Sequence, residues 1–331
     1  MVLFERGFMP MNKGDAEIAK TMYRKMVFIR KFEEKLVELS QVRGRLPGMQ
    51  ILAIGQEAVA VGVVQAMQPK DILVSNHRSH GHLLAKGADP STLLAEIMGK
   101  STGVNKGKSG TLHLAVPEIG ALMTSTVVGA GPPLAVGAAF AQQYRNEPFI
   151  TVVFFGDGAA AEGSVHEAMN LAALWKLPVL FVCENNCWAG AQGLAQHCSL
   201  TRIADRAQSY GFPGQVVDGN DLLEVYAQAQ ELITSCRKGS GPGLMEAKTY
   251  RMRGHGEYDH QHYVDKKELE EWARRSPIQK LEEKLLAAGM MEKRELVDIE
   301  LEIRRQIEVA LKFADESPYP LPTEALDHVW A

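Results

Sequence analysis

The feature that most constrains the fold of this chain is a pair of apolar runs on either side of a segment with the pattern of a helix. Residues 150–155 and 179–183 are apolar and rich in valine and phenylalanine, which is typical of buried strands. Residues 162–176, between them, predict a helix. A strand, a helix and a second strand within about 30 residues form one β-α-β unit, in which the strands run parallel. Their carboxyl ends therefore meet at one edge of the sheet.

Polar residues follow both of these runs. Residues 156–158 (Gly-Asp-Gly) come directly after the first run, and residues 184–186 (Glu-Asn-Asn) after the second. Either motif alone is most often a simple turn. Together they bring the Asp157 carboxylate and the Asn186 carboxamide to the same edge of the sheet, where open α/β sheets bind ligands. Mg²⁺ prefers oxygen ligands and is commonly completed by phosphates, so the pair predicts a magnesium site.

The rest of the chain alternates between strand and helix patterns. This alternation predicts an α/β fold with a doubly wound, mostly parallel sheet flanked by helices. We expect one domain over residues 1–331, with an N-terminal helix and a C-terminal helical extension beyond residue 266. The predicted strands are residues 71–75, 150–155, 179–183, 215–217 and 243–250, and the predicted helices are residues 16–43, 56–67, 91–98, 132–144, 162–176 and 221–237.

Composition excludes several classes of function. Hydrophobic residues make up 46% and charged residues 23% of the 331 positions, as in a globular protein with a large core. The net charge of -4 and the absence of a basic stripe argue against nucleic acid as a partner. No apolar run approaches the length of about 20 residues that a membrane span needs. Residues 1–13 lack the apolar core of a signal peptide.

The four cysteines are too few for a disulfide framework in a chain of this length, which favours a reducing, cytoplasmic location. Cys183 and Cys187 lie on either side of the Asn-Asn turn. A metal pair is one interpretation of them. Packing at the end of a strand is favoured, because no second cysteine pair completes a zinc set.

Four polar clusters follow predicted strands and should project to one edge of a parallel sheet. Besides the two motifs above they are His77-Arg78 with His80, and the glycine-rich loop around His255. An arginine can bind phosphate oxygens through two parallel hydrogen bonds, and a histidine can donate a proton to a developing oxyanion. A lone histidine is more often a surface or core residue than a catalyst. A metal site formed by His255 with His260 and His262 is the least favoured interpretation.

With these motifs in view, the chain resembles the α subunit of the thiamine-diphosphate-dependent decarboxylating component of 2-oxo acid dehydrogenase complexes. The Gly-Asp-Gly and Asn-Asn motifs, about 30 residues apart, are typical of thiamine-diphosphate enzymes. The resemblance extends over nearly the whole chain and implies the diphosphate-type domain of the thiamine-diphosphate-binding fold. Its motifs are residues 55–58, 77–81, 106–110, 128–130, 156–163, 170–178, 184–186 and 249–251, followed by Gly254-His255.

The resemblance also implies roles for single residues. The metal ligands would be Asp157, Asn186 and the backbone carbonyl of Trp188, holding the Mg²⁺ that bridges the diphosphate of the cofactor. His255 would stabilise an intermediate or donate a proton. The residues implied in binding thiamine diphosphate are His77, Arg78, Thr126, Val128, Gly156, Asp157, Gly158, Ala159, Asn186 and His255.

Within the family, residues 77–82, 86–87, 162–163, 166–167 and 253–255 are most like those of acetoin dehydrogenase α subunits. Pyruvate dehydrogenase α subunits share residues 173–178, so pyruvate stays open as a substrate. Branched-chain 2-oxo acid dehydrogenases rank third. The implied reaction is cleavage of acetoin or decarboxylation of a 2-oxo acid, with transfer of the acyl unit to a lipoyl group of an acyltransferase component.

The chain departs from the family pattern at three places. Gly256 stands where regulated members carry a phosphorylatable serine, so we expect no such switch. Residues 187–189 (Cys-Trp-Ala) replace the usual sequence after Asn-Asn, although a backbone carbonyl of Trp188 can still bind a metal. Thr126 stands where glycine is usual beside the aminopyrimidine ring, which leaves the shape of the pocket, and hence the substrate, open.

The sequence offers no convincing carboxylate to activate the aminopyrimidine. In the family this glutamate comes from a separate β subunit, so the resemblance implies an α2β2 heterotetramer. A non-catalytic scaffold subunit is the alternative from another class, and the intact Asp157 and Asn186 argue against it. A nicotinamide dehydrogenase would need a Gly-x-Gly-x-x-Gly motif after an early strand, which residues 129–133 do not supply.

Overall fold

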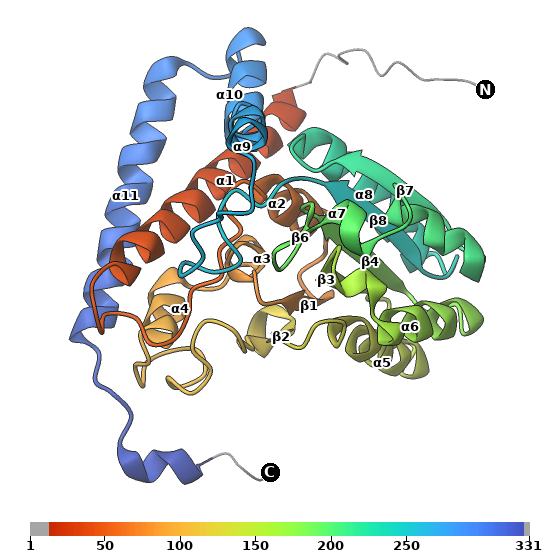
Figure 1. Cartoon of the computed structure of the whole chain (residues 1–331), viewed down its shortest axis with the longest axis horizontal. Helices are drawn as coiled ribbons and strands as arrows, with labels where there is room; N and C mark the ends of the chain where they lie inside the picture. The colour runs from red at the N-terminus through yellow and green to blue at the C-terminus, as the bar shows by residue number, and fades with distance from the viewer. Residues whose placement is uncertain (1–12, 328–331) are drawn as a thin grey trace.

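The computed structural model describes residues 13–327 and places a parallel sheet of six strands at the centre of the fold (Figure 1). Every pair of neighbouring strands in this sheet is parallel. The expected α/β class, with a mostly parallel sheet flanked by helices, is therefore confirmed. In sheet order the strands are β2 (Ala121–Ser125), β1 (Ile72–Asn76), β3 (Thr151–Gly156), β4 (Val179–Asn185), β8 (Gly243–Lys248) and β7 (Gly214–Asp218).

Helices cover both faces of the sheet because side chains alternate in direction along each strand. On β3, Val152 and Phe154 join one buried cluster, and Val153 and Phe155 join the other. The first cluster packs under α1 (Lys13–Ser40), α2 (Glu57–Ala66), α3 (His80–Lys86), α4 (Pro90–Ile97) and α8 (Leu222–Arg237). The second packs under α5 (Gly131–Tyr144), α6 (Gly163–Leu174) and the 3-10 helix η3 (Ile203–Tyr210).

The C-terminal extension consists of α9 (Lys266–Ala273), α10 (Pro277–Ala287) and α11 (Lys293–Glu316). Helix α11 lies alongside α1 and α4, on the left of Figure 1. Its buried residues recur every three or four positions, so that one apolar stripe faces the body of the protein. Lys31 and Lys35 of α1 form ion pairs with Glu300 and Glu308 at 3.2 and 3.0 Å. The stripe consists of Ile299, Ile303, Ile307, Ala310 and Ala314.

The predicted boundaries of the helices and strands lie within three residues of the observed ones. Two of the main elements, β2 and α3, were not predicted. Strand β2 was not predicted, because residues 121–125 form a short edge strand with an irregular burial pattern. Helix α3 was not predicted either, since its first turn contains the polar residues His80 and His82. Both histidines are buried, so tertiary contacts outweigh the polar sequence. The expectation of a single domain stays a prediction.

Residues 1–12, on which most of the signal-peptide expectation rests, lie outside the described residues. Between residues 13 and 327, none of the helices combines the length and the apolar character needed to span a bilayer.

Candidate active site

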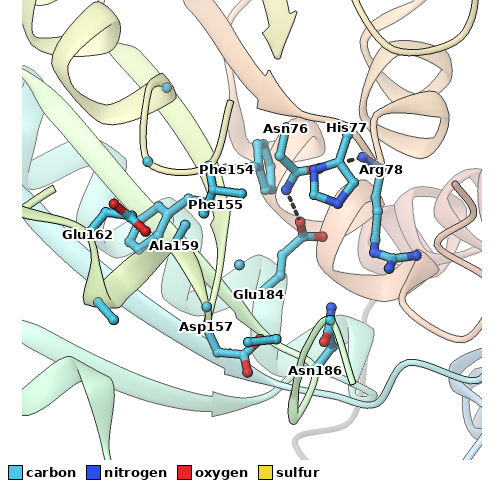
Figure 2. A pocket seen from close by; sticks show the side chains of 18 of the residues that line it. Asn76, His77, Arg78, Phe154, Phe155, Asp157, Ala159, Glu162, Glu184 and Asn186 are labelled. Atoms are coloured by element: carbon cyan, nitrogen blue, oxygen red, sulfur yellow. Dashed lines mark hydrogen bonds between the residues drawn. The ribbon is translucent and has the colours of Figure 1, made fainter. Parts of the chain in front are cut away.

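The candidate site lies where the strand order changes direction. From β1 the chain adds β2 on one side, and then returns to place β3 on the other side of β1. Such a reversal opens a crevice at the carboxyl ends of the two central strands, which is where doubly wound sheets bind ligands. A cavity of about 410 Å³ occupies this position and is lined by residues that follow β1, β3 and β4 (Figure 2). We call it the switch-point cavity.

Asp157 is the most unusual residue of the switch-point cavity. Its side chain follows β3 and is only 1% exposed, yet neither carboxylate oxygen accepts a hydrogen bond from the described residues. Nε2 of His197 lies 3.2 Å from Oδ2, but the two groups are not aligned for a hydrogen bond. Buried carboxylates are normally well paired, so this arrangement fits a group that binds a cation.

Asn186 lies with Asp157 on the same side of the cavity, as Figure 2 shows. Its Nδ2 donates to Oε1 of Gln56 at 3.2 Å, which fixes which way the carboxamide faces. Its Oδ1 accepts the N–H of Trp188 at 3.3 Å, a long bond that leaves a lone pair of this oxygen for another partner. Trp188 also lines the cavity. The three expected metal ligands therefore come from two adjacent loops on one side of one cavity.

The backbone after Asp157 is packed closely against the next loop. A Cβ atom at Gly158 would lie 2.8 Å from Cβ of Ala189, so only glycine fits there without a shift. At Gly156, by contrast, a Cβ atom would meet nothing within 4 Å. Ala159 lines the same part of the cavity and begins a short 3-10 helix ahead of α6. Small residues at these positions keep backbone N–H groups accessible to an anion.

His77, Arg78 and His255 form another part of the cavity wall. The rings of His77 and His255 lie 5.7 Å apart. Arg78 is buried, and its Nη2 donates to the backbone carbonyl of His255 at 3.0 Å, while Nη1 donates to the carbonyl of Leu52. The arginine thus ties the loop that carries His255 to the end of β1.

Burial and positive neighbours keep both of these histidines neutral. Desolvation, followed by the charges of Arg78 and His255, lowers the pKa of His77 to about 3. Desolvation and Arg78 also lower the pKa of His255. Desolvation lowers the pKa of Arg78 to about 10, which still leaves it cationic at neutral pH. The wall therefore offers one fixed positive charge and two imidazoles that can each donate or accept a proton.

The loop around His255 is held by Asp259. The N–H of His255 donates to Oδ2 of Asp259 at 2.8 Å, and the hydroxyl of Tyr263 donates to the same oxygen. Burial would raise the pKa of Asp259, but these hydrogen bonds outweigh it and lower the pKa to about 2. At Gly256, a Cβ atom would lie 2.7 Å from the ring of Tyr258. The absence of a phosphorylation switch at this position stays a prediction.

A hydrogen-bond network around Glu184, partly in the cavity lining, was not found from the sequence. Glu184, at the end of β4, accepts hydrogen bonds from Nδ2 of Asn76 at 2.9 Å and lies 3.2 Å from Nε2 of His82. Nδ1 of His82 lies 2.8 Å from the hydroxyl of Ser75. Oδ1 of Asn76 in turn accepts the N–H of Arg78 at 2.7 Å (Figure 2). Glu184 therefore fixes the turn that carries His77 and Arg78.

Three residues that the sequence pointed to as part of the site are not enclosed in the switch-point cavity. His80 does not line the cavity, because its ring contacts Glu33 and the hydroxyl of Thr111 in the interior. Thr126 does not line it either, and its hydroxyl lies 3.2 Å from Nε2 of His113. Val128 does line the cavity, but it is 52% exposed.

The two less favoured metal sites find no support in the described part of the chain, where no three His, Cys, Asp or Glu side chains gather as a metal site would require. His260 and His262 pack ring against ring at 6.0 Å. Cys183 is fully buried at the end of β4, and burial raises the pKa of its thiol, so it behaves as a packing residue.

Comparison with known proteins agrees with this geometry. The family model described as "Dehydrogenase E1 component" matches residues 24–323. The α subunit of an acetoin:2,6-dichlorophenolindophenol oxidoreductase from Bacillus subtilis is 44% identical, covering 95% of this chain and 94% of that protein. The pyruvate dehydrogenase E1 component α subunit of Zymomonas mobilis is 40% identical, covering 96% and 89%. The α subunit of the acetoin-oxidising enzyme of Cupriavidus necator is 39% identical, covering 96% and 95%.

Proposed function

The chain belongs to the dehydrogenase E1 component family, and from this premise we propose that it is the α subunit of a thiamine-diphosphate-dependent dehydrogenase component. It cleaves acetoin or decarboxylates a 2-oxo acid and passes the acyl unit to a lipoyl group. The observation that carries this proposal is Asp157, a buried carboxylate that accepts no hydrogen bond within residues 13–327, in the same cavity as Asn186.

The residues of the switch-point cavity fit the phosphate end of this cofactor. Asp157, Asn186 and the carbonyl of Trp188 would hold Mg²⁺, which favours oxygen ligands. Gly158 and Ala159 leave the backbone open to a diphosphate, and Arg78 supplies a buried positive charge. The remaining residues that we assign to cofactor binding are His77, Val128, Gly156 and His255 of the cavity, and Thr126, which stands between Ser125 and Val127 of its lining.

When bound, the cofactor supplies a carbon nucleophile for a carbonyl group, which no protein side chain offers. His255 lies in the cavity as a neutral imidazole, so it can donate a proton to an oxyanion or take one up. The ring of His77 lies beside it, with 5.7 Å between the two ring centroids. Arg78 keeps the His255 loop in place through its bond to the backbone carbonyl. We assign catalysis to His255 and positioning to Arg78.

A β subunit completes the site in this proposal. Two carboxylates other than Asp157 line the cavity, Glu184 and Glu162. The carboxylate of Glu184 already contacts Asn76 and His82, and the side chain of Glu162 is exposed to solvent. Neither is a good activator of the aminopyrimidine, so we infer that the activating glutamate comes from the β subunit of an α2β2 heterotetramer. A lipoyl-bearing acyltransferase would be the further partner.

Acetoin is the first candidate substrate, since an acetoin-oxidising α subunit shares 44% of its residues with this chain. Pyruvate follows, because pyruvate dehydrogenase α subunits reach 40% identity, and branched 2-oxo acids come third. A location in a reducing cytoplasm stays a prediction from cysteine usage. A scaffold without catalysis is disfavoured, because the cavity keeps its two expected oxygen ligands.

The test is to purify the chain together with the β subunit and to titrate thiamine diphosphate by calorimetry with and without Mg²⁺. We expect Mg²⁺-dependent binding and turnover of acetoin or a 2-oxo acid, and no turnover from the α chain alone. Asp157→Ala should weaken binding by roughly 100-fold or more, as loss of a metal ligand does. Asp298→Ala, on the exposed side of α11, is the matched control and should bind normally. Turnover by the α chain alone would refute the division of labour.

A further inference from the structure

His197 is a residue of the switch-point cavity that the proposed function leaves without a role. It ends the one-turn helix α7 (Leu194–His197), which follows the small hairpin of β5 (Trp188–Ala189) and β6 (Gln192–Gly193). Its side chain is only 9% exposed and lines the cavity. Neither ring nitrogen has a hydrogen-bond partner among the described residues. A buried imidazole with two unpaired nitrogens requires an explanation.

The distance to Asp157 provides one. Nε2 of His197 lies 3.2 Å from Oδ2 of Asp157, and no hydrogen bond joins them. Adjacent ligands of an octahedral ion with bonds of about 2.1 Å lie about 3.0 Å apart, which is the bond length multiplied by the square root of two. The two atoms are therefore spaced as neighbouring ligands of one divalent ion.

The local fold holds His197 in this place. The N–H of Leu194 donates to the carbonyl of Cys187 at 2.9 Å, so the hairpin closes directly beside Asn186. Past His197, the guanidinium of Arg206 donates to the carbonyl of Ala160 and to the sulfur of Cys198 at 3.4 Å. The segment is thus tied to both of the loops that carry the oxygen ligands.

We propose that His197 is a further ligand of the divalent ion held by Asp157 and Asn186, a proposal that rests on the proposed function. Asp157, Asn186 and the carbonyl of Trp188 would supply three oxygens and the diphosphate further ones, and His197 would add a nitrogen ligand to the same ion. Imidazole suits later transition metals better than magnesium, so this site binds ions such as Co²⁺ and Ni²⁺ more tightly relative to Mg²⁺ than an all-oxygen site does.

The experiment uses the complex of this chain with the β subunit and thiamine diphosphate, loaded with Mn²⁺ in place of Mg²⁺. Pulsed electron paramagnetic resonance detects a nitrogen bound directly to Mn²⁺. We expect this ¹⁴N coupling in the unchanged complex, its loss in His197→Ala, and its retention in the control His166→Ala, whose ring bonds Tyr210 away from the cavity. The preference for Co²⁺ over Mg²⁺, from competition titrations, should fall by roughly tenfold or more in His197→Ala.

A second variant, His197→Gln, keeps a polar side chain of similar reach and should also lose the coupling, in case the alanine variant folds poorly. Cofactor-dependent Mn²⁺ binding without ¹⁴N coupling in the unchanged complex would overturn the assignment and show that His197 is only a neighbour of Asp157. Absence of any cofactor-dependent Mn²⁺ binding would overturn the proposed function as well, so the two failures are distinct.

Discussion

The two sides of the switch-point cavity differ in how completely the chain builds them. On the side formed by the ends of β3 and β4, Asp157 and Asn186 are 1% and 5% exposed. On the side formed by the segment between β2 and α5, Val127 and Val128 line the same cavity but are 65% and 52% exposed. One side is thus enclosed by this chain, and the other is an apolar surface open to solvent.

This difference indicates that the chain provides only part of a site. Exposed apolar side chains beside a cavity mark a surface that another molecule covers. Further exposed apolar side chains lie on α5 and α6, and together with Val127 and Val128 they suit a large partner better than a small ligand. We expect the β subunit to cover this side, with the aminopyrimidine end of the cofactor between the two subunits. The exposed apolar residues of α5 and α6 are Leu134, Phe140, Tyr144, Leu171 and Leu174, and Trp175 directly follows α6.

The largest expected effect tests the chemistry that this chain supplies to the cavity. His255→Ala should lower kcat by about 10²–10⁴-fold, because it removes a group placed for proton transfer. The free energy of unfolding should change little, since the loop is held by backbone bonds to Asp259 and Arg78. Steady-state kinetics and urea unfolding of the assembled complex measure the two quantities. His260→Ala, exposed on the same loop, is the control, and equal activity of both variants would remove the assigned role.

A smaller effect, on stability and on cofactor affinity, tests the buried contacts of Glu184 with Asn76 and His82. Glu184→Gln should lower the free energy of unfolding by about 1–3 kcal/mol, because the new amide group opposes a donor of Asn76 or His82. Cofactor affinity should fall as well, because Asn76 accepts the N–H of Arg78 and so positions the residue that we assign to the diphosphate. The second change Asn76→Asp restores one donor–acceptor pair and should recover part of both losses. A double variant no better than Glu184→Gln would argue against the pairing.

A third change tests the open side. Val127→Glu should alter the stability of the chain by less than about 0.5 kcal/mol, because the side chain is exposed. Its affinity for the β subunit should fall by about tenfold or more, since the charge would lose water at the contact. Val309→Glu on α11 is the matched control, with 67% exposure against 65%. Equal binding of the two variants to the β subunit would show that the partner docks elsewhere.

The smallest effect concerns pH. The pKa of His77 is about 3 in the folded protein and about 6.5 when unfolded, so between these values the unfolded chain binds the additional proton. Stability of the cofactor-free protein should therefore rise with pH across this window, by at most about 1.4 kcal/mol per pH unit from this group. His77→Gln should flatten the dependence in urea unfolding at about pH 5 and about pH 6. If the variant keeps the same dependence of stability on pH, that dependence comes from groups other than His77.

The fold, and the meeting of Asp157 with Asn186 in one cavity, were accessible from the sequence because both depend on local order. Asp157 and Asn186 each follow a buried strand directly, and parallel strands bring such positions together whatever the rest of the chain does. His255 follows the last strand of the sheet in chain order in the same way. Its separation from β8 (Gly243–Lys248) is short enough for the loop to reach the cavity.

Other residues could not be found in this way because their positions depend on packing. His197 lies in a one-turn helix beyond a hairpin, and no periodic pattern places it beside Asp157. Glu184 stands in the Glu-Asn-Asn motif, but its partners Asn76 and His82 come from another part of the chain. For His80 the prediction was wrong in the other direction. We expected it at the site with His77, but it begins α3 and its ring contacts Glu33 in the interior.

The arrangement of α11 beside α1 has a consequence for how the chain is made. Because synthesis runs from the amino terminus, α1 leaves the ribosome before the stripe of Ile299, Ile303 and Ile307 has been made. Until then, the flank of α1 that contacts α11 stays uncovered, although growing chains generally begin to fold from the amino terminus. The nascent protein therefore exposes this flank until α11 has been made, and loss of α11 would leave the flank exposed to chaperones and proteases.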